Sequence, residues 1–172
     1  RQKLRHIARR NPDIIKTVFS AMEHCGWKPA LLTGTNKLEK IKRSRCSMSH
    51  KAMWHESFVG YTGDDFFEAL DKQLVRIKKT LGRDTYTSDT EFGKLSSEWA
   101  RRLHLRPGIP VGVGAYDAHM GAVGGGVEEG VLVKVMGTST CDMIVGPKTS
   151  SANQESTEHL VKGICGPVYY TN

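Results

Sequence analysis

The sequence changes character at Arg106-Pro107-Gly108, and this change limits the possible folds more than any other feature. Before it, the chain is charged, poor in glycine and mostly helical in its apolar pattern. After it, short β-branched runs alternate with glycines. Helical segments together with short β-branched runs predict an α/β protein. We therefore expect residues 1–107 and 108–172 to belong to two different domains.

Composition excludes several classes of protein. Hydrophobic residues make up 38% of the chain and charged residues 25%, which is typical of a globular protein. The longest apolar runs are far shorter than the roughly 18 residues that cross a membrane, and the basic start leads into no signal-peptide core. The four cysteines form no Cys-x-x-Cys pair, which favours reduced thiols over a disulfide framework or a zinc site. We expect a cytoplasmic protein without a membrane partner.

Charge is unevenly distributed along the chain. Residues 1–107 carry 22 Lys or Arg against 12 Asp or Glu, whereas residues 108–172 carry 3 against 6. A basic segment is compatible with nucleic-acid binding or with attraction of an anionic nucleotide. The basic residues are spread out, with few aromatic residues among them. This pattern favours a solvated basic face, and we expect no nucleic-acid partner.

Several segments have a clear local pattern. Asn11-Pro12-Asp13 is typical of a helix start, and helical spacing of apolar residues continues toward Gly26. Ala30 to Gly34 is a short apolar run that enters a turn. Further expected elements are, in order, helices over 64–81 and 96–105, a buried strand over 109–115, a small-residue helix over 118–125, strands over 131–136 and 141–145, a polar loop over 147–159, and an apolar element that begins at Gly163.

Asp117 follows the expected buried strand and precedes a glycine-containing helix. In open α/β sheets, ligands bind beyond the carboxyl ends of the strands. A carboxylate at this position is able to accept the proton of a substrate hydroxyl that attacks phosphorus. An aspartate at the start of a helix is equally typical of an N-cap, and the residue alone does not distinguish these roles.

A hydroxyl-rich turn, Gly137-Thr138-Ser139-Thr140, joins the two strands that follow. Backbone N–H groups and hydroxyls in such a turn are able to hold a phosphate, although an ordinary hairpin has the same appearance. The combination of an acid after one strand and this turn 20 residues later favours the phosphate-binding interpretation.

A third segment, from Arg43 to Glu56, contains Lys51 beside aromatic and small residues. A lysine in this setting either binds a sugar oxygen or lies on the surface. His50 and His55 are five residues apart and do not form the His-Glu-x-x-His pattern, so we expect no zinc site.

These segments together resemble the FGGY carbohydrate kinase family, and within it the ribulokinase branch. The resemblance covers nearly the whole chain from Ala30 onward. The segments that carry it are, in order, Ser44-Arg45-Cys46, His50 to Glu56, Gly114 to Gly124, Lys134 to Asp142, and Gly163 to Gly166.

The resemblance implies an α/β fold with ribonuclease-H-like domains of the actin-like ATPase superfamily. Residues 1–107 would end the first kinase domain and residues 108–172 would begin the second. It further implies that Asp117 is the catalytic base and touches the sugar, that Lys51 binds the sugar, and that Gly137, Thr138 and Ser139 contact the phosphates of ATP. The implied reaction is phosphorylation of L-ribulose by ATP with Mg²⁺; a homo-oligomer is left open.

Some motifs of the family lie outside this sequence. The family's amino-terminal phosphate loop, its glycine-rich adenosine-binding segment and its signature are missing. We therefore interpret the chain as parts of two domains of a longer kinase, inactive alone. Another ketose or polyol kinase, a non-catalytic interaction module and a basic nucleic-acid-binding domain are the alternatives.

Overall fold

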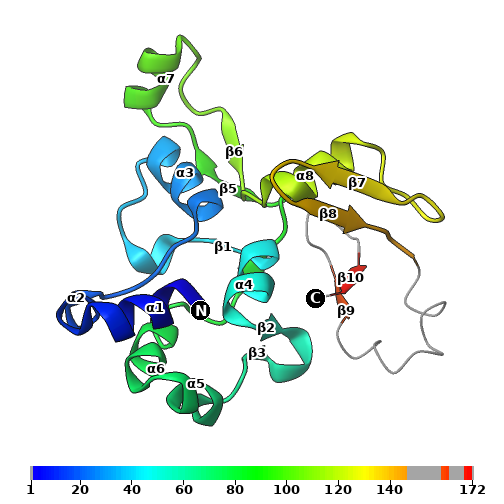
Figure 1. Cartoon of the computed structure of the whole chain (residues 1–172). Helices are drawn as coiled ribbons and strands as arrows, with labels where there is room; N and C mark the ends of the chain where they lie inside the picture. The colour runs from blue at the N-terminus through cyan, green and yellow to red at the C-terminus, as the bar shows by residue number, and fades with distance from the viewer. Residues whose placement is uncertain (1, 147–159, 163–168, 172) are drawn as a thin grey trace.

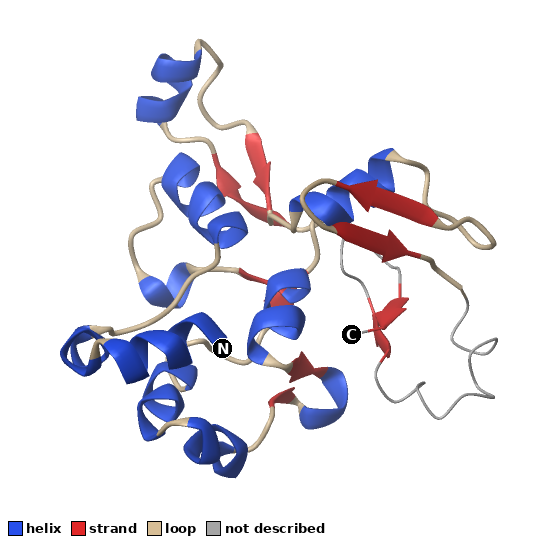
Figure 2. Ribbon diagram, in the orientation of Figure 1, coloured by secondary structure: helices blue, strands red, loops and turns tan. Residues whose placement is uncertain are grey.

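The structure is a computed structural model that describes residues 2–146, 160–162 and 169–171. It is a mixed α/β arrangement in which helices predominate before residue 107 (Figures 1 and 2). The α-helices are α1 (Gln2–Arg10), α2 (Pro12–Thr17), α3 (His24–Thr33), α4 (Arg45–Ala52), α5 (Asp64–Leu70), α6 (Lys72–Lys78), α7 (Ser97–Leu103) and α8 (Asp117–Gly124). Two 3₁₀ turns are η1 (Leu38–Lys40) and η2 (Glu56–Phe58).

The strands are short and pair in twos. They are β1 (Arg43–Ser44), β2 (Trp54–His55), β3 (Gly60–Tyr61), β4 (Thr85–Tyr86), β5 (Glu91–Lys94), β6 (Pro110–Gly112), β7 (Val133–Met136), β8 (Thr140–Met143), β9 (Leu160–Lys162) and β10 (Tyr169–Thr171). The pair β1–β4 is parallel, and the pairs β2–β3, β5–β6, β7–β8 and β9–β10 are antiparallel. Within the described ranges no sheet exceeds two strands. The predicted α/β class is confirmed at this level.

The helix predicted from Asn11 toward Gly26 is wrong beyond Thr17, where α2 ends. Arginine side chains bind the backbone carbonyls of the segment that follows. Arg76 donates to the carbonyls of Ile15 and Val18, and Arg43 donates to the carbonyl of Ala21. These carbonyls therefore receive hydrogen bonds from distant side chains, and residues 18–23 form no helix or strand before α3 begins at His24.

Of two other helices, α3 was not predicted and the second differs in extent from its prediction. The run from Ala30 to Gly34 is the last turn of α3, which ends at Gly34 in the left-handed conformation, with φ of 69°. The helix expected over 64–81 is divided at Asp71, whose backbone is extended. The Asp71 carboxylate accepts from the Gln73 N–H at 2.9 Å and so caps α6. Because the Asp71 side chain satisfies a free N–H group at the start of α6, a second helix begins here. The residues expected to form one helix therefore form two, which pack together.

The helix expected over 96–105 is confirmed. Ser96 caps α7 by accepting from the Trp99 N–H at 3.3 Å. Strand β5, just before it, was not predicted. It pairs with β6 across residue 107, and Val113 packs with Ala30 and Phe92 in a buried cluster. The division into two domains at residue 107 remains a prediction.

The helix predicted from Ala118 and the hairpin predicted after it are both confirmed, as α8 and β7–β8. The two elements pack closely through glycines. A Cβ placed on Gly121 would lie 3.3 Å from Val135, and one on Gly125 would lie 2.9 Å from Val133. Small residues on α8 therefore let the helix lie directly on β7. The predicted loop over 147–159 and the element expected from Gly163 lie outside the described residues.

The apolar stripe expected over 64–81 is largely buried, as predicted, but the stripe expected between Asn11 and Gly26 is not, because Ile14 and Phe19 are 56% and 70% exposed. Ile15 packs with Ala8 and Ile77, and Phe67 packs with Leu74 and Val75. No helix in the described part of the chain has the length and apolar character needed to cross a membrane.

Gly114 links β6 to α3 by close backbone contact. A Cβ at this position would overlap the carbonyl oxygen of Cys25. We expect Gly114→Ala to lower the free energy of unfolding by about 1–3 kcal/mol, the usual cost of overpacking. Gly124→Ala is the matched control, because its Cβ meets no atom within 4 Å and alanine is the better helix former. Urea denaturation of both variants measures the difference; equal stabilities would contradict the close contact.

Candidate functional site

Side chains from the end of α4 contact Tyr116 and His119 at the start of α8, although the two segments are far apart in the sequence. The Lys51 ammonium lies 5.5 Å from the ring centroid of Tyr116, within the range of a cation–π contact. The His50 ring lies 5.9 Å from the Tyr116 ring and 4.9 Å from the His119 ring. Tyr116 directly precedes Asp117. The structure therefore brings together two of the three predicted parts of the site.

Trp54, which follows the end of α4, is fixed by contacts with distant residues. The helix ends at Met53, which adopts a left-handed conformation with φ of 59° and turns the chain sharply. Trp54 is buried, and its indole N–H donates to the Arg83 carbonyl at 2.7 Å. The Arg45 guanidinium lies 5.1 Å from the Trp54 ring centroid. These contacts fix the end of α4, so the backbone of the exposed Lys51 has a defined position.

A buried thiol and an imidazole connect the two helices. The Cys46 Sγ lies 2.8 Å from the His119 Nδ1, and the Tyr116 N–H points to the same sulfur at 3.5 Å. Cys46 is fully buried and His119 is 7% exposed. The contact between α4 and α8 is thus made by polar groups that are shielded from water.

Asp117 is the first residue of α8, and Tyr116 occupies the N-cap position. Asp117 is exposed, and it forms no hydrogen bond or ion pair with another residue that the structure describes. An acid in the first turn interacts favourably with the helix dipole. The capping alternative therefore has no support from this geometry, and the carboxylate faces solvent, where a substrate can reach it.

The hydroxyl-rich turn lies at the same end of α8 as Asp117. Gly121 lies against Val135 and Gly125 against Val133, so helix and strand run in opposite directions. Four helical residues span about 6 Å, close to the span of two strand residues. Continuing this register places Asp117 opposite Gly137. Figure 1 shows the start of α8 near the turn that joins β7 to β8.

The turn itself is open to solvent. Gly137, Thr138 and Ser139 are all exposed. The Gly137 N–H donates to the Ser139 carbonyl at 2.9 Å and closes the turn. The hydroxyls of Thr138 and Ser139 lie on the exposed tip of a hairpin, so this geometry permits contact with a phosphate.

The two histidines of the cluster are neutral near pH 7. Burial, and after it His50, lower the pKa of His119 to about 4, although Asp117 opposes the change. The pKa of His50 is lowered by partial burial of its ring against the neighbouring rings, and then by Lys51, although the residue as a whole is exposed. The formal charges in this cluster are consequently those of Lys51 and Asp117.

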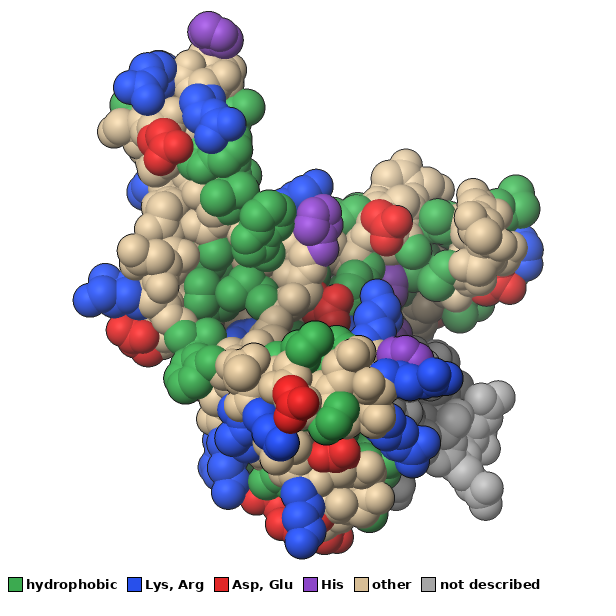
Figure 3. All heavy atoms as spheres, turned by 60° about the vertical axis from the view of Figure 1, so that its left-hand side comes forward, with side chains coloured by type: hydrophobic (Ala, Val, Ile, Leu, Met, Phe, Trp, Pro, Cys, Tyr) green, Lys and Arg blue, Asp and Glu red, His purple; other side chains and the backbone are tan. Residues whose placement is uncertain are grey.

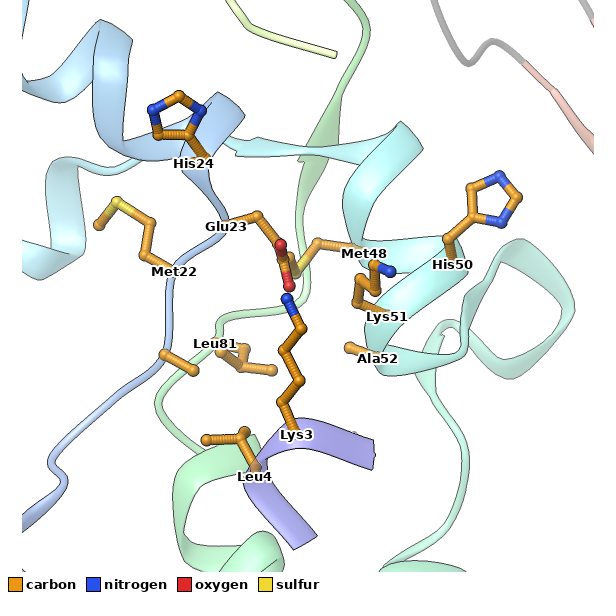
Figure 4. A pocket seen from close by; sticks show the side chains of 11 residues that line it. Lys3, Leu4, Met22, Glu23, His24, Met48, His50, Lys51, Ala52 and Leu81 are labelled. Atoms are coloured by element: carbon orange, nitrogen blue, oxygen red, sulfur yellow. The ribbon is translucent and has the colours of Figure 1, made fainter. Parts of the chain in front are cut away.

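A cavity of about 570 Å³ adjoins this cluster (Figure 4). Lys51 and His50 line it together with residues of α1 and of the extended segment before α3. Lys3 and Glu23 point toward one another across it (Figure 4).

On the face shown in Figure 3, Lys and Arg side chains are interspersed with Asp and Glu and form no continuous basic patch.

Metal ligands are sparse in this region. The described residues contain no group of three or more His, Cys, Asp or Glu side chains that could hold a metal ion. Mg²⁺ often binds through one or two carboxylates together with substrate phosphates and water. The exposed Asp117 beside the hydroxyl-rich turn fits that mode, but the described residues do not form a protein cage for the ion.

Sequence reasoning missed the Cys46–His119 pair and the role of Tyr116 in joining the two helices. Cys46 and His119 are 73 residues apart, so their spacing carries no local signal.

Comparison with known proteins gives a consistent set of relatives, although no protein-family model matches the chain. The chain is 39% identical to a ribulokinase of Vibrio parahaemolyticus over 162 residues, 36% identical to a ribulokinase of Shouchella clausii over 168 residues, and 34% identical to a ribulokinase of Bacillus licheniformis over 168 residues. These alignments cover 94–96% of this chain but only 27–28% of each relative. The chain therefore spans slightly more than a quarter of the length of the ribulokinases it resembles.

The low pKa of His119 predicts a specific dependence of stability on pH. As the pH falls below about 6.5, the unfolded imidazole binds a proton that the folded one does not bind until about pH 4. The contribution of His119 is therefore complete above pH 6.5 and is lost between pH 6.5 and 4. We expect the wild-type chain to lose more unfolding free energy over this interval than His119→Asn, as measured by urea denaturation at several pH values. Parallel curves would contradict the burial of a neutral ring.

Proposed function

We propose that this chain forms part of a sugar kinase that transfers a phosphoryl group from ATP to L-ribulose and gives L-ribulose 5-phosphate and ADP. The observation that carries the proposal is the contact between the Lys51 end of α4 and the Tyr116-Asp117 start of α8. Similarity to ribulokinases along 94–96% of the chain supports the choice of sugar.

In this proposal Asp117 is the general base. A sugar hydroxyl attacks the γ-phosphorus of ATP, the bond to the bridging oxygen of ADP breaks, and the Asp117 carboxylate takes the hydroxyl proton. Its exposed position at a helix N-terminus leaves the carboxylate accessible to that hydroxyl. Lys51 donates a hydrogen bond to another sugar oxygen, so the sugar is held between two groups of opposite charge.

The turn of Gly137, Thr138 and Ser139 contacts the phosphates of ATP. The register of α8 on β7 supports this assignment, because it places the turn next to Asp117. Mg²⁺, bound with the ATP phosphates, supplies neutralisation of the charge that develops during transfer.

The remaining parts of the proposal concern the longer protein. We propose that the longer protein is a cytoplasmic kinase with two ribonuclease-H-like domains. Residues 1–107 would end the first domain and residues 108–172 would begin the second. Whether the protein forms a homo-oligomer is left open. Because the chain spans about 28% of its relatives, segments outside it would complete the sugar and nucleotide sites.

The substrate is tested with the full-length protein that contains this chain. We expect release of ADP with L-ribulose to exceed release with xylulose, ribitol or glycerol at equal concentration, in a coupled assay with ATP and Mg²⁺. A clear preference for xylulose or glycerol would keep the kinase proposal and reject the sugar. No transfer to any ketose or polyol would reject the kinase proposal itself.

Lys51→Ala tests sugar binding. A charge-assisted hydrogen bond contributes about 1.5–3 kcal/mol, so we expect KM for the sugar to rise roughly ten- to a hundred-fold. Lys72→Ala is the matched control, because Lys72 is also exposed but lies on α6, away from α8. If KM for the sugar is unchanged, Lys51 is only a surface residue.

Asp117→Asn tests the base. The amide keeps the shape of the side chain but is a very poor proton acceptor, so kcat should fall by ~10²–10⁴-fold with ATP affinity nearly unchanged. Thermal melting checks that the fold is retained. A variant with unchanged kcat would mean that another group takes the proton.

A further inference from the structure

The bond between Cys46 and His119 lies within a short distance of both proposed sugar-binding groups. Cys46 precedes Lys51 by five residues on α4, and His119 follows Asp117 by two residues on α8. At about 1.5 Å per residue, these separations are about 7.5 Å and 3 Å along the helix axes. A shift at this bond is therefore passed on to the distance between Lys51 and Asp117.

The sulfur makes two contacts with the second segment. It lies 2.8 Å from the His119 Nδ1 and accepts from the Tyr116 N–H at 3.5 Å. Two contact points on either side of Asp117 restrict rotation of α8 as well as translation. The Tyr116–His119 ring contact, at 5.7 Å between centroids, adds to this restriction.

Neither side chain is placed to act on a substrate itself. Cys46 is fully buried and His119 is 7% exposed. The ring of His119 is neutral near pH 7 because burial lowers its pKa to about 4. The pair is consequently not a thiolate–imidazolium nucleophile of the kind that requires a charged histidine.

We propose that Cys46 and His119 are positioning residues, which hold Asp117 and Lys51 at the separation that a single sugar molecule needs. This inference rests on the proposed kinase function. Proper alignment of reacting groups contributes strongly to catalysis, and a misplacement of about 1 Å costs up to ~10²-fold in rate. Loss of the bond should therefore lower kcat by more than the accompanying loss of stability explains.

Two pairs of variants in the full-length kinase test the inference. Cys46→Ala and His119→Leu delete the bond, whereas Cys46→Ser and His119→Asn each retain a polar atom that is able to keep it. We expect kcat with the sugar to fall roughly ten- to a hundred-fold in the first pair and to recover most of its value in the second. KM for ATP should stay unchanged in all four. If a deleting variant fails to fold, its conservative partner and the other deletion supply the test.

Ser47→Ala is the matched control. Ser47 is the next residue on α4, is 1% exposed and donates at 3.2 Å to the carbonyl of Ser44, the N-cap residue of α4. It should lose stability as Cys46→Ala does but keep kcat. Equal falls in kcat for Ser47→Ala and Cys46→Ala would mean that general loosening of α4 explains the effect, and would overturn the inference.

A double-mutant cycle with Asp117→Asn gives the second readout. When the base is absent its position no longer matters, so Cys46→Ala should have little further effect on kcat. The same fold-loss in both backgrounds would overturn the positioning role. If the wild-type kinase is active and Cys46→Ala keeps full kcat, only this inference fails. If the wild type transfers phosphate to no ketose or polyol, the proposed function fails and the inference falls with it.

Discussion

The hydrogen bond between the Cys46 thiol and the His119 imidazole is the contact on which the candidate site depends. It joins a helix that carries a lysine to a helix that begins with an aspartate, and it does so away from water. A buried hydrogen bond is costly to break because water cannot reach the separated groups, and each would be left without a hydrogen-bond partner. The contact therefore gives the two exposed charged groups nearby a defined separation, which is what recognition of a small polyhydroxy ligand requires.

A second constraint comes from the glycines of α8. Gly121 and Gly125 allow the helix to lie on β7, and the register of that packing sets Asp117 beside the turn at Gly137. A larger residue at either glycine would push the helix away from the strand and move the acid relative to the turn. The packing of one helix on one strand thus determines whether an acid and a hydroxyl-rich turn share a site.

Local features of the fold were predictable from the sequence. Ser96 as the cap of α7, the small-residue helix α8 and the hairpin around the hydroxyl-rich turn all depend on neighbouring residues. Predictions failed where distant groups decide the conformation. Arg76 and Arg43 bind the carbonyls that a longer α2 would have used, and β5 becomes a strand because β6 pairs with it.

The candidate site likewise contains residues that the sequence predicts and a contact that it does not. Asp117, Lys51 and the turn were identifiable as residue types in suggestive local patterns, and the similarity to ribulokinases over nearly the whole chain supports the same choice. The link between Cys46 and His119 was not predictable, because a contact across 73 residues leaves no periodic or spacing signal. Only the folded arrangement shows that Lys51 contacts Tyr116, the residue that directly precedes Asp117.

The most direct measurement is a crystal structure of the full-length protein with L-ribulose bound. We expect the Lys51 Nζ and a carboxylate oxygen of Asp117 each to lie within hydrogen-bond distance, about 2.6–3.2 Å, of oxygens of the same sugar molecule, with the Cys46–His119 bond intact. A sugar that is bound without contact to either residue would contradict the account.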